Sequence, residues 1–121
     1  MSTVHMIVGS LVVLGYIIVL ALNIRTATGK PMLSFQRPLS MGAATLYLLQ
    51  VLLGLSLLAE GEEIPAAHFL IALLAIFSIG AEHMLTGREV DSRRAGRIAA
   101  ITNVITLAIV LTAYMIGELN S

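Results

Sequence analysis

The most restrictive feature of this sequence is that its charged residues divide it into four uncharged stretches of bilayer length. The stretches hold 19, 22, 18 and 20 residues, and the third is interrupted only by His68. A helix that crosses about 30 Å of hydrocarbon needs about 20 mostly apolar residues. Backbone groups in lipid must be hydrogen-bonded within their own segment, which a helix achieves. We therefore expect four transmembrane helices, at about residues 4–23, 40–59, 65–84 and 92–117.

The composition excludes several classes of protein. Apolar residues make up 58% of the chain and charged residues 12%, whereas a soluble domain carries about 25% charged residues. The absence of cysteine excludes a disulfide scaffold and a zinc–thiolate site, and the zero formal charge disfavours a nucleic-acid-binding protein. A chain of 121 residues has room for one domain, covering residues 1–121. The predicted fold is all-α, an integral membrane four-helix up-down bundle.

Helix-capping residues and helix breakers support these boundaries. Ser40 is suited to cap the second helix, and Pro65 is suited to the first turn of the third. Asp91 or Ser92 can start the fourth helix, and Gly61 marks a tight turn between the second and third. Each predicted helix is thus bounded by residues that are typical of such positions.

The basic residues predict how the chain is oriented in a membrane. All seven lie between the first and second or the third and fourth stretches: Arg25, Lys30, Arg37, Arg88, Arg93, Arg94 and Arg97. The other side carries four acidic residues and no basic one: Glu60, Glu62, Glu63 and Glu118. Because positively charged loops stay in the cytoplasm, we expect a multi-pass protein of the cytoplasmic (inner) membrane with both termini on the outer, non-cytoplasmic side.

Each stretch also carries small and polar residues at helical spacing, which predicts a face turned into the bundle. These faces are His5, Gly9, Val12, Tyr16 and Asn23; Ala43, Tyr47, Gln50 and Gly54; His68, Ala72, Ala75 and Ile79; and Asn103, Leu107, Val110, Tyr114 and Gly117. Such residues either let helices pack closely or leave room for a planar macrocycle between them. No charged residue lies mid-span, and Glu82 lies at the inner end of the third helix, which disfavours a pump or proton-coupled transporter.

Two histidines form the candidate site. His5 begins the first helix and His68 begins the third, so both should lie near the outer end at similar depth. Neutral imidazoles are axial ligands of haem iron, and four-helix bundles hold cofactors between facing helices. The alternative is that each histidine places its tip among lipid headgroups. His83 lies beside Glu82 among the cytoplasmic charges, and we expect it to be solvated or to lie among lipid headgroups.

The segment from Gln50 to Gly54, followed by a short turn and by His68 with Ala72, resembles part of one half of the haem A synthase family. Each half of those proteins is a four-helix bundle, in which a histidine near the outer end pairs with another two helices later. The interval of 63 residues between His5 and His68 is similar. More loosely, the chain is similar to small b-type membrane cytochromes. The family's glutamate upstream of the first histidine has no counterpart in residues 1–4, which disfavours haem A synthesis itself.

These patterns together predict a small membrane haem b protein, or a cytochrome-like subunit, that takes part in electron transfer near the outer face. The predicted haem-binding residues are His5 and His68 as axial ligands of the iron, with Gly9, Tyr47, Gln50, Gly54 and Ala72 around the ring. A quinone is a further expected ligand. The expected partners are membrane lipids and either other subunits of a membrane complex or further copies of the chain.

A non-catalytic role is the alternative. The chain would then be an accessory or structural subunit of a respiratory or photosynthetic membrane complex. Under either hypothesis we do not expect an enzyme acting by itself, because the loops are short and carry no arrangement of a nucleophile and a base.

Overall fold

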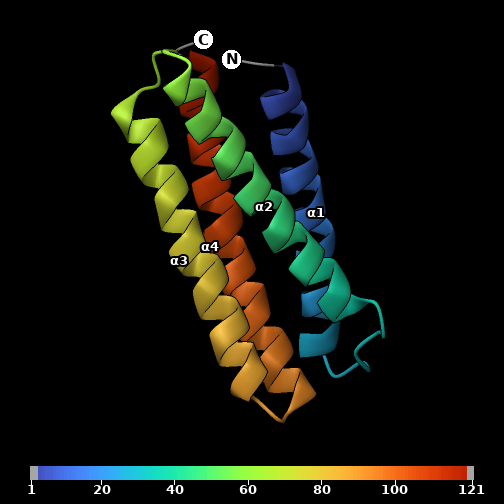
Figure 1. The fold of residues 1–121 in the computed structure, drawn as a ribbon. Coiled ribbons are helices and arrows are strands. Elements are labelled where there is room, and N and C mark those ends of the chain that lie inside the picture. The colour runs from blue at the N-terminus through green and yellow to red at the C-terminus, as the bar shows by residue number, and fades with distance from the viewer. Residues whose placement is uncertain (1–2, 120–121) are drawn as a thin grey trace.

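The computed structural model describes residues 3–119, and these residues form four helices and their connections. The helices are α1 (Thr3–Ala27), α2 (Gln36–Ala59), α3 (Ala66–Arg88) and α4 (Ser92–Leu119). Consecutive helices run in opposite directions, so the start of α1, the α2–α3 turn and the end of α4 lie together (Figure 1). The prediction of an all-α four-helix up-down bundle is confirmed.

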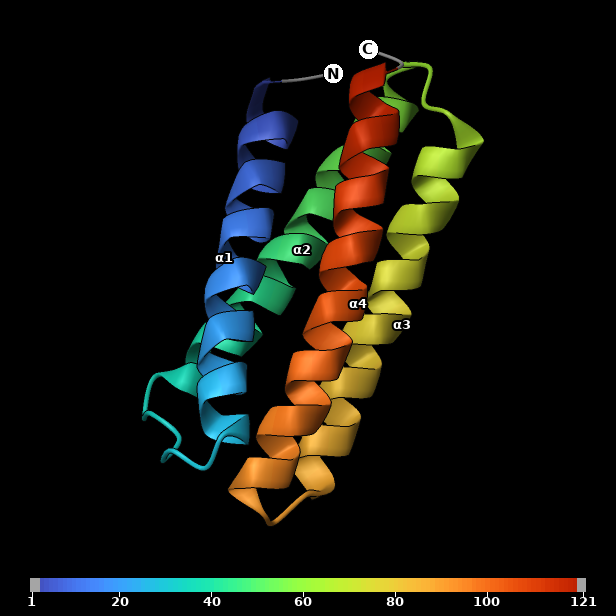
Figure 2. The same ribbon diagram turned by 180° about the vertical axis from the view of Figure 1, so that it is seen from behind.

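The four helices are not packed equally. α4 lies between α1 and α3 and packs along both, and α1 also packs along α2 (Figure 2). α2 and α3 make few contacts with each other, and α1 and α3 stand on the diagonal. The bundle is therefore least closed along the side between α2 and α3.

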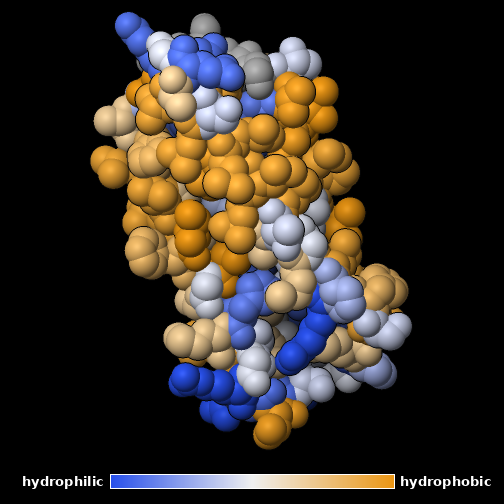
Figure 3. Space-filling model, viewed as in Figure 1, coloured by the Kyte–Doolittle hydropathy of each residue, from blue (hydrophilic) through white to orange (hydrophobic). Residues whose placement is uncertain are grey.

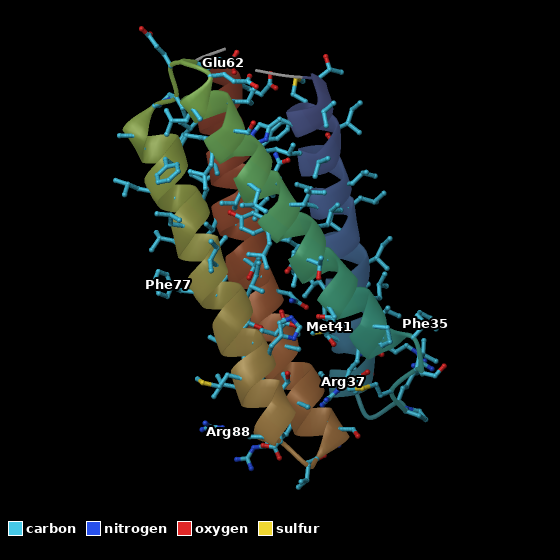
Figure 4. The ribbon with its side chains drawn as sticks, in the orientation of Figure 1. Phe35, Arg37, Met41, Glu62, Phe77 and Arg88 are labelled. Atoms are coloured by element: carbon cyan, nitrogen blue, oxygen red, sulfur yellow. The ribbon has the colours of Figure 1, made fainter. Side chains whose placement is uncertain are left out.

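The two ends of the bundle differ in charge, and we name them accordingly. The acidic end holds the α2–α3 turn with Glu62, and the basic end holds the two other loops with Arg37 and Arg88 (Figure 4). Hydrophilic residues gather at both ends of the face seen in Figure 3, and an apolar band lies between them. Phe77, with 75% of its surface exposed, points away from the bundle within this band.

All four helices are long and apolar enough to cross a membrane. Many large apolar side chains, such as Leu52 and Leu70, are exposed on the outer surface instead of being buried. In water this surface would be unfavourable, but it suits contact with lipid tails.

The inward faces predicted from helical spacing are observed. Val12, Tyr16 and Val19 of α1 are fully buried and meet Ala75 and Val110 in the core. His5 is also buried, whereas His68 is half-buried. The period of 3.6 residues therefore identified the buried side of each helix correctly.

The predicted start of the second helix is wrong by four residues. α2 begins at Gln36, so Ser40 lies inside the helix and its hydroxyl donates to Oε2 of Glu82 across 2.9 Å instead of capping the chain. Pro38 does not prevent this, because the N–H groups of a first turn have no partner within the helix. Pro65 also lies one residue before α3 and not in its first turn.

Other expected boundaries are confirmed. Oδ1 of Asp91 accepts a hydrogen bond from the N–H of Arg93 at 3.0 Å, as a residue that caps a helix does. Gly61 turns the chain between α2 and α3 with φ of +91°, which favours glycine. α1 and α3 run about one turn past their predicted ends, to Ala27 and Arg88, because charged residues can continue a helix beyond the apolar span.

Candidate functional site

The predicted site residues come together in one cavity near the acidic end of the bundle. The cavity measures about 180 Å³ and has walls from all four helices. All seven of the residues predicted to surround a haem line it: His5, Gly9, Tyr47, Gln50, Gly54, His68 and Ala72. The structure thus places residues from α1, α2 and α3 around one space, although they are up to 67 positions apart in the sequence.

His5 and His68 face each other across this cavity. Their ring centroids are 6.5 Å apart, and the ring planes are inclined by 71°. Two imidazoles bound on opposite sides of one metal atom, each through a nitrogen about 2.0 Å away, would have centroids about 6.3 Å apart. The spacing of the two rings is therefore the spacing that a shared axial pair requires.

Hydrogen bonds orient both imidazoles. Nδ1 of His68 lies 2.6 Å from the carbonyl oxygen of Ala113 in α4, which can only accept a proton. His68 therefore donates through Nδ1, and its Nε2 is the nitrogen with a lone pair. A backbone carbonyl that holds the other ring nitrogen is typical of histidines that bind metals.

Gln50 makes the corresponding contact with His5. Its amide Nε2 lies 3.4 Å from Nε2 of His5, and an amide nitrogen can only donate. Nε2 of His5 is therefore the acceptor and carries a lone pair, as in His68. The other end of the amide, Oε1 of Gln50, is buried and has no hydrogen-bond partner within residues 3–119.

Two glycines make room for these side chains. A Cβ atom on Gly54 would lie 3.3 Å from Cε1 of the His5 ring, and one on Gly9 would lie 2.9 Å from Nε2 of Gln50. The space that these glycines were predicted to leave for a haem is occupied in part by the side chains of His5 and Gln50. A side chain at either glycine would displace the pair.

Tyr47 connects α2 to α3 below the histidines. It is 4% exposed, and its hydroxyl donates to the carbonyl oxygen of Ala72 across 2.6 Å. Because α2 and α3 otherwise make few contacts, this hydrogen bond helps to fix the width of the cavity. The hydrogen bond between Tyr47 and Ala72 holds α2 and α3 together, and it accounts for both residues without a bound ligand.

A second polar site lies toward the basic end, and the sequence analysis did not identify it. Glu82 was expected at the end of its helix, but only 2% of its surface is exposed. Ser40 donates to Oε2 at 2.9 Å, and Nδ2 of Asn103 donates to Oε1 at 2.6 Å. Its burial follows the stripe of α3, because Ala75, Ile79 and Glu82 are separated by four and three residues. Extending the predicted stripe by one turn would have revealed it.

The hydrogen bonds continue from Glu82 through the other helices. Oδ1 of Asn103 accepts from Nδ2 of Asn23 at 2.6 Å, and Oδ1 of Asn23 accepts from Nε2 of Gln36 at 3.0 Å. Nε2 of Gln36 also lies 3.0 Å from the hydroxyl oxygen of Thr26. Residues of α1, α2, α3 and α4 thus form one buried chain of hydrogen bonds, which we call the amide chain.

Asn103 is the central residue of this chain, and its replacement tests how much the chain stabilises the bundle. Asn103→Leu should lower the free energy of unfolding by about 2–4 kcal/mol, because Glu82 and Asn23 would each lose a buried partner. The measurement is a denaturant titration in detergent followed by circular dichroism. Thr112→Val is the matched control on α4, since its exposed hydroxyl bonds only within its own helix. Equal stability of the two variants would contradict the prediction.

His83, expected to be solvated or among lipid headgroups, is partly exposed. Its side chain is 28% exposed, and Nε2 lies 3.9 Å from Oε2 of Glu82. No group of three or more histidine, cysteine, aspartate or glutamate side chains within residues 3–119 is arranged to hold a metal ion. Neither cavity therefore contains a metal site built from such a group.

Comparisons of this chain with known protein families, with curated proteins and with solved structures give no match. Its function is therefore inferred from the geometry of the two cavities.

Proposed function

We propose that this chain is a small membrane protein that binds haem b between His5 and His68 and takes part in electron transfer. The observation that carries the proposal is the facing pair of imidazoles, with centroids 6.5 Å apart and with Nδ1 of His68 held by a backbone carbonyl. When bound, a haem supplies one-electron redox chemistry. The protein supplies two neutral nitrogen ligands in a largely apolar setting.

The resemblance to one half of the haem A synthase family supports the same function. In that family a histidine near one end of a bundle pairs with a histidine two helices later. Here the pair comes from α1 and α3, which stand diagonally. A haem held by this pair would be bound between α1 and α3.

Two features of the cavity determine how a haem would be accommodated. A site for a ligand of this size typically has a volume of about 300–1,000 Å³, whereas the cavity measures about 180 Å³. The ring edge would therefore extend through the open side between α2 and α3. The Gln50 amide must also turn away from Nε2 of His5, at a cost of about 1 kcal/mol for one hydrogen bond.

The charges around the cavity favour one position for the propionates. Glu62, Glu63 and Glu118 line the cavity near its mouth, and all seven basic residues lie in or beside the loops at the other end. Among residues 3–119, no Lys or Arg side chain lines this cavity to pair with a propionate. We therefore propose that the propionates face water or a basic partner surface.

We further propose that the acidic end faces outward and that the basic end is cytoplasmic, in an inner membrane. The distribution of the basic residues supports this orientation, since basic loops are retained in the cytoplasm. Both termini are then outside, and the haem lies near the outer face. A quinol dissolved in the bilayer is the electron donor that suits this position, because the open side between α2 and α3 faces the lipid.

The direct test is a visible absorption spectrum of the protein, purified in detergent after expression with ample haem. Wild-type protein should give a dithionite-reduced minus oxidised spectrum with a sharp alpha band, and a pyridine haemochrome assay should find about one haem b per chain. A flat difference spectrum from folded, helical protein would refute the haem proposal.

A second function is favoured by one specific contact. The hydrogen bond from Gln50 to His5 gives that imidazole a protein partner without any bound group. This supports a non-catalytic subunit of a membrane complex, in which the apolar outer surface would contact other subunits. That function predicts a flat spectrum together with co-purification of other membrane proteins under mild detergent.

A further inference from the structure

A second cavity lies beside the buried carboxylate of Glu82. Its volume is about 320 Å³, and it is lined by residues of all four helices and of the α1–α2 loop. One wall carries Glu82 and His83 of α3, and the facing wall carries Arg37, Ser40 and Met41 of α2. Arg37 and Met41 mark the basic half of α2 in Figure 4. Nothing in the haem proposal uses this cavity.

The amide chain gives this cavity a definite charge preference. Asn103 directs an N–H group toward Glu82, Asn23 directs one toward Asn103, and Gln36 directs one toward Asn23. All three amides therefore present their donor ends in the direction of the carboxylate. Oriented dipoles of this kind stabilise a negative charge, so the network offsets part of the burial that disfavours the charged form of Glu82.

No basic side chain neutralises this anion. Within residues 3–119, the charged or titratable group within ion-pair distance of the Glu82 carboxylate is the imidazole of His83, at 3.9 Å. Arg37 is exposed, and its guanidinium donates to the carbonyl oxygen of Thr86 at 3.3 Å. A buried charge is costly unless it is paired. A cation entering the cavity would supply the missing partner.

The size and walls of the cavity indicate what kind of cation fits. A single water needs about 10–15 Å³ of such space, so about 320 Å³ accommodates several non-hydrogen atoms. Met32, Met41, Ala95 and Ala99 contribute apolar wall. The lining residues of α2 and α3 lie on the side of the bundle where these two helices make few contacts.

We propose that this cavity binds an organic ammonium cation. The ammonium group pairs with Glu82 and donates to its oxygens, and the apolar substituent lies against the methionines and alanines. A bare metal ion would leave most of the space unfilled, and the guanidinium of Arg37, which also lines the cavity, donates to the carbonyl oxygen of Thr86. The site is independent of the histidine pair, which lies at the opposite end of the bundle.

Benzylammonium chloride is a suitable probe, and benzyl alcohol is its neutral counterpart of similar shape. Calorimetric titration of the detergent-purified full chain should detect binding of benzylammonium and not of benzyl alcohol. Glu82→Gln keeps the shape and removes the charge, and it should weaken binding at least about tenfold. Glu82→Asp keeps the charge, and it should retain more of the affinity than Glu82→Gln does.

Glu89→Gln is the matched control, because it removes a carboxylate from the same end of the bundle but outside the cavity. Its affinity for benzylammonium should equal that of the wild type. Circular dichroism confirms that each variant is folded. The proposal is overturned if benzyl alcohol binds as well as benzylammonium, if Glu82→Gln binds as the wild type does, or if no benzylammonium binding is measured. A response to sodium chloride alone that depends on Glu82 would also overturn it, in favour of an inorganic cation.

Discussion

His68→Ala is expected to abolish the haem absorbance of the purified protein, and His5→Ala is expected to do the same. If the proposed haem site exists, each change removes one of its two nitrogen ligands and leaves a space that alanine cannot fill. His68→Ala also leaves the carbonyl oxygen of Ala113 without its donor. We expect the alpha band of the reduced minus oxidised spectrum to fall nearly to baseline in both variants, at equal protein concentration.

His83→Ala is the matched control for this experiment. It removes the same type of side chain from the opposite end of the bundle, where the imidazole lies 3.9 Å from Glu82 and lines the other cavity. The spectrum of His83→Ala should equal that of the wild type. If either His5→Ala or His68→Ala keeps a full alpha band, then that histidine is not an axial ligand. If His83→Ala loses the alpha band, the haem is bound at the basic end of the bundle and not between His5 and His68.

Gly96→Ala is expected to destabilise the bundle strongly. A Cβ atom at Gly96 would lie 2.8 Å from the backbone nitrogen of Ala27, 2.9 Å from Cβ of Thr26 and 3.0 Å from the backbone oxygen of Asn23. Two of these atoms belong to the backbone, so no side chain can rotate to relieve the clash. α1 and α4 must move apart at the point where they pack most closely.

The cost of that separation should be about 2 kcal/mol or more, as for overpacking in other cores. A denaturant titration in detergent measures it. Gly80→Ala is the matched control, because Gly80 is also helical and a Cβ atom there would have no atom within 4 Å. That variant should be neutral or more stable by up to about 1 kcal/mol, through helix propensity. Equal effects at the two glycines would show that α1 and α4 do not meet at Gly96.

The residues of the acidic-end cavity were predictable because each depends on position within its own helix. His5 and His68 each begin a helix, and helices that cross one membrane place such residues at similar depth. Helical spacing then placed Gly9 below His5 and Ala72 below His68. Helical spacing did not predict the contact between Gln50 and His5 or the hydrogen bond from His68 to Ala113. Those contacts depend on how the helices are rotated and spaced against one another.

The residues around Glu82 in the basic-end cavity could not be predicted from positions within one helix. The sequence predicts Glu82 as a boundary of the apolar span, because charge normally marks where a membrane helix leaves the lipid. Its burial depends on partners from other helices, namely Ser40 of α2 and Asn103 of α4. The separations of 42 and 21 residues leave no local signal of these pairs. Continuing the helical stripes to Ser40 and Glu82 would have indicated that both face inward, but not that they meet.

The sequence by itself determined that the chain has four long apolar helices and which face of each turns inward. These properties follow from the cost of placing charges in an apolar phase and from the period of the helix, and both act within one segment. Only the tertiary structure decided that α2 stands away from α3, that Gly96 brings α1 against α4, and that Glu82 lies inside the bundle. These depend on side-chain volumes and hydrogen bonds between helices, which form only when all four are packed together.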